Sequence, residues 1–204
     1  MSGPDPSPRF LAALAGFDAA NAEDPNRETA DGAEHPRELL YARRLTDWVL
    51  RLRPDASEAL RLAARCQHLR RWEIPRASYP ADRPGYLRWR RDLPKFHARR
   101  SAEILASVGY EPATIARVQA LNLKQNLATD PECQVLEDAL CLVFLQFQLA
   151  DLAQRTEDDK VVNALRKSWA KMSPAGRAAA AALPFGPRER RLVHTALEST
   201  DPSA

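Results

Sequence analysis

Two carboxylates in a strongly apolar segment are the first candidates for chemistry in this chain. Glu137 and Asp138 are the only charged residues between Val135 and Ala150, in the run VLEDALCLVFLQFQLA, which predicts a core helix. An ionised carboxylate in such a helix costs several kcal/mol unless cations or hydrogen-bond donors compensate for it. The alternatives are pairing with arginines, service as a metal ligand or general base, or, for one of the two, exposure at the wetter end of the helix.

Three of the four histidines are expected at inward or helix-end positions. Each alone is most simply explained by a hydrogen bond to a backbone carbonyl, and no pair has the spacing of a metal motif such as HExxH. Imidazole and carboxylate are nevertheless suitable ligands for zinc, manganese, iron or nickel. The candidate metal ligands are therefore His68, His97, Asp138 and His35, and the candidate catalytic residues are Glu137, Asp138 and His68.

A basic and aromatic stretch, QHLRRWEIPRASYP at residues 67–80, adjoins His68. Arginine presents a planar fork of donors to phosphate or carboxylate oxygens, while aromatic rings can cover an apolar body or a base. The stretch therefore predicts the rim of an anion pocket with His68 at its floor. Its candidate binding residues are Arg71, Trp72, Arg76, Tyr79, Tyr86, Trp89 and Arg90, with Lys124, Lys167 and Lys171 as further candidates.

The charge of the chain is unevenly distributed. Seven acidic and two basic residues lie between Asp18 and Glu38, a net charge of −5. Eleven basic and three acidic residues lie between Arg65 and Arg100, a net charge of +8. An anionic ligand would be drawn to the basic block. The alternative is that its arginines neutralise the acidic segment and the buried carboxylates.

Composition indicates an ordinary globular protein. The chain of 204 residues, 45% hydrophobic and 28% charged, suits one compact domain over residues 8–198 with flexible segments at 1–7 and 199–204. No apolar run is long enough to span a membrane, and the start lacks the pattern of a secretory signal. Three scattered cysteines are expected as core residues in a reducing cytoplasm.

Apolar residues recur at spacings of three and four, so the chain is predicted to be all-α, with eight to nine helices and no strand. Asp55 and Asp130 are expected to cap two of the helices, and Pro94 to kink or break a third. The predicted helices span residues 8–22, 36–52, 55–72, 86–108, 112–126, 130–155, 158–171, 174–183 and 187–198.

Several of these strings resemble a known family. QHLRRWEIPRASYP, GYLRWR, a histidine after Lys95-Phe96, QVLEDALCLVFLQ and KSWAKMS are similar to motifs of the domain-of-unknown-function family four-two-zero-two, from Phe10 to about Leu183. The resemblance implies no mechanism. The order His35-Pro36, His68 and a late helical Asp138 also resembles HD-domain phosphohydrolases, which implies an HD-like helical core and a bound metal. Because Leu69 follows His68, the His-Asp pair of that superfamily is missing, and His97 would stand in as a ligand.

Three functions follow as alternatives. The first is a metal-dependent, hydrolase-like enzyme that acts on a phosphorylated or otherwise anionic small molecule such as a nucleotide. The second is a helical module that binds RNA through the arginine and aromatic rim, whose affinity would fall steeply with salt. The third is a partner-binding helical protein without catalysis. No membrane partner is expected, and the oligomeric state is left open.

Overall fold

The computed structural model describes residues 7–198, and the chain divides into two compact units, Met1–Cys133 and Gln134–Ala204. The prediction of one domain over 8–198 stays a prediction, and the units are described separately. Of the predicted flexible termini, 1–6 and 199–204 lie outside the described residues. The hydroxyl of Ser7, the first described residue, accepts a hydrogen bond from the Phe10 amide and caps the first helix.

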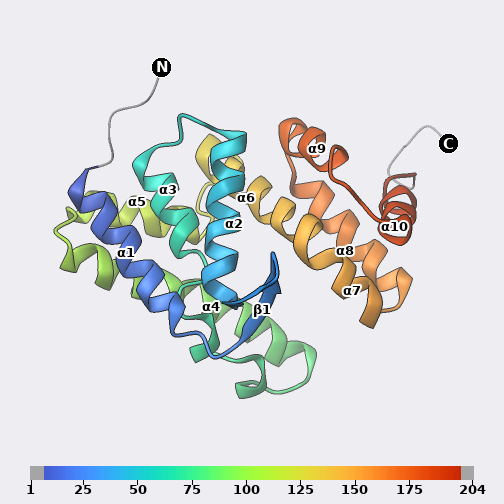
Figure 1. Cartoon of the computed structure of the whole chain (residues 1–204), viewed down its shortest axis with the longest axis horizontal. Coiled ribbons are helices and arrows are strands. Elements are labelled where there is room, and N and C mark those ends of the chain that lie inside the picture. Colours follow the sequence, from blue (N-terminus) through green and yellow to red (C-terminus); the bar gives the residue numbers. More distant parts are fainter. Residues whose placement is uncertain (1–6, 199–204) are drawn as a thin grey trace. The chain divides into compact units, whose positions relative to one another are not determined.

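The predicted all-α fold is confirmed, with ten α-helices among the described residues (Figure 1). The count exceeds eight to nine because the predicted helix 130–155 is divided by a π-helical turn. The first unit contains α1 (Pro8–Ala22), α2 (Arg37–Leu52), α3 (Glu58–Cys66), α4 (Arg83–Ser107), α5 (Pro112–Asn122), and the start of α6 (Pro131–Val143). Two short 3₁₀ turns, η1 (Arg71–Glu73) and η2 (Arg76–Ser78), connect α3 to α4.

The core of the first unit forms where small residues let helices approach one another. Ala63 and Ala64 are fully buried on α3, which packs against both α2 and α5. Gly16 lies so close to α4 that a Cβ there would be 2.9 Å from the Ile104 side chain. α4 is continuous through Pro94, so the predicted break does not occur.

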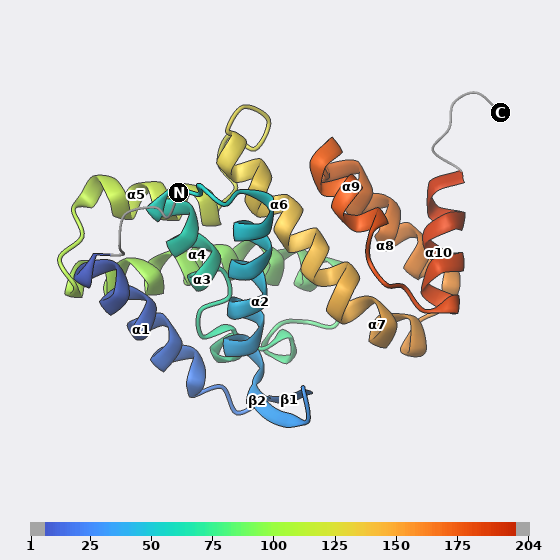
Figure 2. The same ribbon diagram turned by 45° about the horizontal axis from the view of Figure 1, so that its top comes forward.

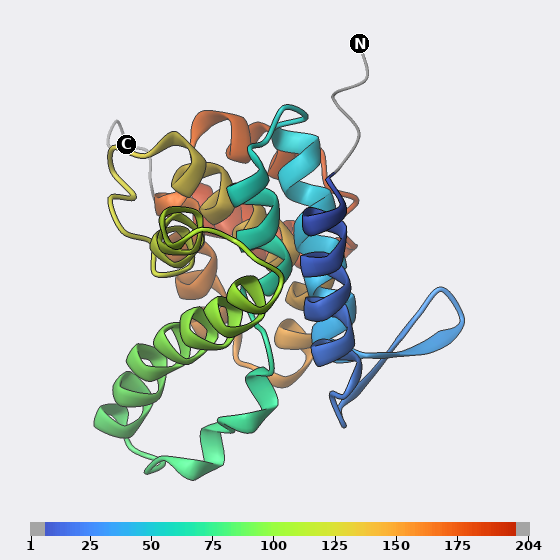
Figure 3. The same cartoon turned by 90° about the vertical axis from the view of Figure 1, so that its left-hand side faces the viewer.

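A β-hairpin contradicts the prediction that the chain contains no strand. β1 (Arg27–Ala30) pairs with β2 (Ala33–Pro36) in an antiparallel register that sets Glu28 opposite His35. Asp31 and Gly32, between the strands, have φ angles of 52° and 77°, as a two-residue hairpin turn requires. The hairpin extends away from the α1 and α2 helices (Figures 2 and 3). The Asp-Gly pair was the sequence signal for this turn.

The second unit is a group of short helices. It contains the remainder of α6, the π-helical turn η3 (Phe144–Gln148), α7 (Leu149–Arg155), α8 (Asp158–Lys171), α9 (Pro174–Ala181) and α10 (Pro187–Glu198). α10 packs against α7 and α8, with Leu165 and Leu192 among the buried residues. Within residues 7–198, no helix is long and apolar enough to cross a membrane.

Ser57, rather than the predicted Asp55, caps α3. The Ser57 hydroxyl accepts a 3.1 Å hydrogen bond from the Leu60 amide, whereas the Asp55 side chain is 83% exposed. We therefore expect Ser57→Ala to lower the free energy of unfolding by about 1 kcal/mol, the usual cost of losing a helix cap. The matched variant Asp55→Ala should change it by less than about 0.5 kcal/mol. Urea denaturation of both variants measures the difference, and equal effects would contradict the assignment of the cap.

Candidate active site

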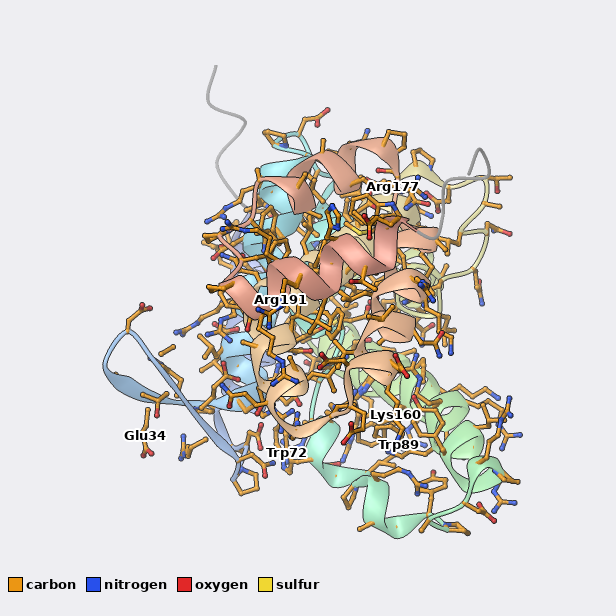
Figure 4. All side chains as sticks on the ribbon, turned by 90° about the vertical axis from the view of Figure 1, so that its right-hand side faces the viewer. Glu34, Trp72, Trp89, Lys160, Arg177 and Arg191 are labelled. Carbon is orange, nitrogen blue, oxygen red and sulfur yellow. The ribbon has the colours of Figure 1, made fainter. Side chains whose placement is uncertain are left out.

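The first unit contains a cavity of about 380 Å³ whose lining combines arginines, tryptophans and one carboxyl group. Its wall is formed by the start of α2, by η1 and η2, and by α4. Trp72 and Trp89, labelled in Figure 4, belong to this wall. The residues that decide its chemistry are Arg37, Glu38, Arg71, Trp72, Arg76 and Trp89.

The end of α1 holds the start of α2 in place. Asp24, which is 1% exposed, accepts a hydrogen bond from the Glu38 amide at 3.0 Å through one carboxylate oxygen. Its other oxygen accepts hydrogen bonds from the backbone amide and the side-chain amide of Asn26, at 2.9 and 2.8 Å. One buried carboxylate therefore satisfies donors on both sides of the hairpin and places Glu38 in the cavity wall.

Backbone geometry places the basic and aromatic residues. Arg70 adopts φ 52°, a left-handed conformation that ends the turn after α3, and its amide donates to the Asn21 side chain at 3.1 Å. The next residues, Arg71 and Trp72, then face the cavity. Across from them, the Trp89 indole donates to the Ile74 carbonyl at 3.0 Å, which ties α4 to the loop.

Glu38 is the carboxyl group of the cavity, and it is 6% exposed. Burial raises the pKa of Glu38 from 4.5 to about 7, although the nearby charges of Arg71 and Arg37 act in the opposite direction. The Arg71 guanidinium lies 3.9 Å from a Glu38 oxygen. A carboxyl group with a pKa near neutrality can both accept and return a proton at physiological pH, which suits it to general acid–base chemistry.

Two histidines lie behind Glu38. His68 Nδ1 is 3.3 Å from a Glu38 oxygen, and its Nε2 is 3.5 Å from a nitrogen of Arg71. Because a guanidinium only donates, Nε2 must accept, and neutral His68 carries its proton on Nδ1, toward Glu38. Burial holds the pKa of His68 well below its usual value, with the charge of Arg71 adding to the effect. Tyr41 stacks on the His68 ring at 4.1 Å.

His97 is also neutral and is almost fully buried. Its ring centroid lies 5.8 Å from that of His68. Nδ1 is 2.8 Å from the Leu69 carbonyl, which only accepts, so the proton again lies on Nδ1. Burial, together with the neighbouring His68, lowers the pKa of His97 to about 3. Nε2 is buried and makes no hydrogen bond.

The predicted metal ligands do not form a recognisable metal centre. Among residues 7–198, no group of three or more histidine, cysteine, aspartate or glutamate side chains is arranged to hold an ion. His35 lies on the hairpin, and the Arg71 guanidinium close to His68 Nε2 would repel a cation at that nitrogen. These residues therefore fit a metal poorly. A bound metal stays a prediction.

The structure brings part of the predicted rim together. Arg71, Trp72, Arg76 and Trp89 line the cavity. The other predicted binding residues of the first unit do not line the cavity. The Tyr79 hydroxyl donates to Asp92, and Tyr86 is 43% exposed with its ring tilted against that of Trp89. Arg90 is exposed, and Lys124 is half-buried in the turn after α5.

Several arginines of the basic block pair with the acidic segment, as one alternative predicted. Arg65 forms a two-bond pair with Asp18, with both distances at 2.6 Å, and Arg70 lies 2.7 Å from Glu23. Arg76 instead donates to the Tyr79 carbonyl at 2.9 Å, which folds the loop around it.

The two predicted buried carboxylates lie in the second unit, and their burial is confirmed at 3% exposure for Glu137 and 2% for Asp138. Asp138 accepts a 2.8 Å hydrogen bond from the Ser173 amide and another from the Ser173 hydroxyl, at the start of α9. Lys171, a predicted binding residue, lies 3.5 Å from Glu137. Lys167, the other predicted lysine of this unit, is exposed on α8.

The sequence reasoning missed Glu38, Arg37 and Asp24. A signal for Glu38 was present, because residue 38 lies four before Ala42 and seven before Leu45 on the buried face of α2. A carboxylate on a buried helix face needs compensating cations or donors and is a candidate for chemistry, as argued from the sequence for Glu137 and Asp138. Asp24 gave no comparable signal, since its burial depends on the hairpin that brings Glu38 back to it.

The raised pKa of Glu38 predicts a distinctive dependence of stability on pH. The folded state holds the Glu38 proton more firmly than the unfolded chain, so this contribution to stability is present below pH 4.5 and is lost as the pH rises through about 7. The difference between the two pKa values of Glu38, 4.5 and about 7, corresponds to about 3 kcal/mol of folding free energy. Relative to the parent, Glu38→Gln should therefore become more stable as the pH rises from 4.5 to above 7.

Urea denaturation of parent and Glu38→Gln at several pH values measures this difference. The lowered pKa values of His68 and His97 act in the opposite direction, since their contribution is lost as the pH falls below 6.5. Both proteins contain these histidines, so their effect largely cancels in the comparison. A difference that stays constant with pH would show that Glu38 is not the titrating group.

The role of Asp138 can be tested through its contact with Gly176. A Cβ at Gly176 would lie 2.6 Å from the Asp138 carboxyl carbon, so Gly176→Ala should displace the carboxylate from the start of α9. We expect Asp138→Ala and Gly176→Ala each to lower the free energy of unfolding by about 2 kcal/mol. Ala175→Ser, at the exposed neighbouring position, is the control and should change the free energy of unfolding by less than about 0.5 kcal/mol. Full stability of Asp138→Ala would contradict a structural role.

Comparison of the chain with known protein families identifies the same family that its sequence motifs resemble. The profile of the family described as Domain of unknown function (DUF4202) matches residues 11–193. No curated protein and no solved structure matches the chain. The likeness to HD-domain phosphohydrolases stays a prediction. Because the family match covers most of the sequence, including the cavity residues and both buried carboxylates, this chain belongs to the DUF4202 family.

Proposed function

We propose that this protein is an enzyme that binds a phosphorylated or otherwise anionic small molecule in the cavity of the first unit and hydrolyses it with Glu38 as general base and acid. The observation that carries the proposal is the position of Glu38, a buried carboxyl group with a pKa of about 7 in the wall of a cavity rich in arginine. The three buried cysteines, none in a disulfide, support a cytoplasmic setting.

The lining supports an anionic ligand with a flat or apolar part. Arg37, Arg71 and Arg76 line the cavity together with Glu38, so its cationic groups outnumber its one carboxyl group. Arg71 also lies over the Trp89 ring, 5.0 Å from its centroid, which orients its fork of donors. Trp72 and Trp89 supply ring faces on which a base could stack. A nucleotide combines these properties.

The proposed step is proton transfer coupled to attack by water. The Glu38 carboxylate accepts a proton from water as the water oxygen bonds to the phosphorus or carbonyl carbon and the bond to the leaving oxygen breaks. Glu38 then gives that proton to the leaving oxygen, so the step is balanced in atoms and charge. The Nδ1–H of His68 orients the carboxylate, and the arginines stabilise the charge that develops on the substrate.

Nucleic-acid binding is the second candidate function. It is favoured by the start of α4, where Tyr86 and Leu87 are 43% and 55% exposed beside the exposed Arg88 and Arg90. Aromatic and arginine side chains in such a surface can stack on unpaired bases and contact phosphates. This surface gives no role to Glu38, which is why the enzyme is the first proposal.

Calorimetric titration with 5′-AMP and with adenosine tests the anion site. We expect AMP to bind at least about tenfold more tightly than adenosine, because the arginines bind its phosphate. Arg71→Gln should weaken AMP binding, while Arg88→Gln, an exposed arginine outside the cavity lining, should not. Equal affinity for the two ligands would reject the anion site, and RNA binding that weakens steeply with salt would favour the second candidate.

Release of phosphate from a panel of phosphorylated metabolites, with and without a chelator, tests the reaction. Glu38→Gln should still bind AMP but should lose turnover by about 10²-fold to 10⁴-fold, the usual contribution of a general base. Turnover unchanged in Glu38→Gln would reject the assigned role. Loss of turnover on chelation would show that a metal takes part.

A further inference from the structure

The second unit contains a cavity of its own, of about 400 Å³, whose wall is formed by η3, α8, α9 and α10. Its lining is mainly apolar and includes Leu145, Leu165 and Val193. Protein interiors are normally packed with few voids larger than a water molecule. Cavities of a few hundred Å³ with an apolar lining and a few polar groups are typical of small-molecule sites. This cavity takes no part in the function proposed for Glu38.

Two local features of the sequence create the space. The alanine run of α9 places Ala180 and Ala181 on the wall, where any larger side chain would reduce the volume. On another side, Leu145 lines the cavity from η3, a π-helical turn inserted into an otherwise α-helical segment. Such turns cost hydrogen-bond geometry and are frequent at functional sites. The turn is thus a second, independent feature of the cavity wall.

The polar groups of the lining are cationic or neutral. α10 supplies Arg190 and His194, and the lining contains no acidic side chain; all of its residues belong to the described part of the chain. Arg190 donates one hydrogen bond to the Phe185 carbonyl at 3.1 Å, which leaves other N–H groups of its fork for a ligand. His194 Nδ1 lies 3.3 Å from Glu198, a residue outside the lining, which leaves Nε2 for a ligand.

We infer that this cavity is a second ligand site, specific for an amphipathic carboxylate whose apolar chain lies between α8, α9 and α10 and whose carboxylate pairs with Arg190. The apolar wall favours a hydrocarbon body through burial of its surface. The Arg190 fork matches the two oxygens of a carboxylate, and His194 Nε2 lies on the same helix as an additional donor or acceptor. An apolar cation would be repelled by the charge of Arg190 and should bind more weakly.

Calorimetric titration of the full chain with decanoate, below its micelle concentration, tests the site. We expect saturable binding of one decanoate per chain, and binding of decanol that is weaker by about tenfold or more because decanol cannot pair with the guanidinium. Arg190→Gln should weaken decanoate binding by about tenfold. Arg191→Gln, the neighbouring arginine outside the lining, should leave it unchanged (Figure 4).

Substitutions that fill the cavity provide a second test of the ligand site. Ala181→Leu and Val193→Phe place larger side chains on two different walls and should abolish decanoate binding, whereas Ala178→Leu, on the exposed face of α9, should not. Circular dichroism and melting temperature show that each variant is folded. Absence of saturable binding to the parent, equal binding of decanol and decanoate, or binding that survives in a folded cavity-filling variant would each overturn the inference.

Phosphate release by the cavity-filling variants separates this inference from the proposed reaction. We expect their turnover to equal that of the parent, because the two cavities share no lining residue. Failure of decanoate binding leaves the role of Glu38 untouched, and failure of the Glu38 variants leaves the second site untouched.

Discussion

The hydrogen bond from the Glu38 amide to the buried carboxylate of Asp24 is the interaction on which the candidate active site depends. It joins the end of α1 to the start of α2 across the hairpin, so that Glu38 is held in the cavity wall and away from solvent. Burial then favours the protonated carboxyl group, and His68 Nδ1 and the Arg71 guanidinium lie against its two oxygens. One structural bond thus determines both the position and the acidity of the group proposed to catalyse.

The arginines of the first unit fall into two groups that the sequence alone did not separate. Exposed pairs such as Arg70 with Glu23 contribute little to stability, since solvent screens them and their side chains lose entropy. The arginines of the cavity wall are different, because they line a confined space that also contains the buried carboxyl group of Glu38, which lies 3.9 Å from Arg71. Charge neutralisation and the proposed anion binding would therefore involve different arginines of the basic block.

The helices could be predicted closely because their signals are local. The bounds of α1, α8 and α10 agree with those predicted from apolar periodicity, and α1 and α10 have a proline in their first turn. The predicted Asp130 cap of α6 is confirmed, because its carboxylate accepts hydrogen bonds from the Glu132 and Cys133 amides. The hairpin was missed because its strands are only four residues long and polar, so the Asp31-Gly32 turn was its only signal. The π-helical turn η3 left no recognisable pattern. The site was predicted only in part, because Asp24 becomes buried through a long-range contact.

The proline within α4 has a consequence for how the cavity can move. Pro94 has no amide proton, so the Arg90 carbonyl lacks its usual helical hydrogen bond, and α4 is weakened between its two halves. The half after Pro94 carries the buried Phe96 and His97, whereas the half before it carries Trp89 and reaches solvent at Tyr86. Local opening of α4 should therefore begin in its first half, which the Trp89–Ile74 hydrogen bond still ties to the loop, while the histidines of the second half keep their positions.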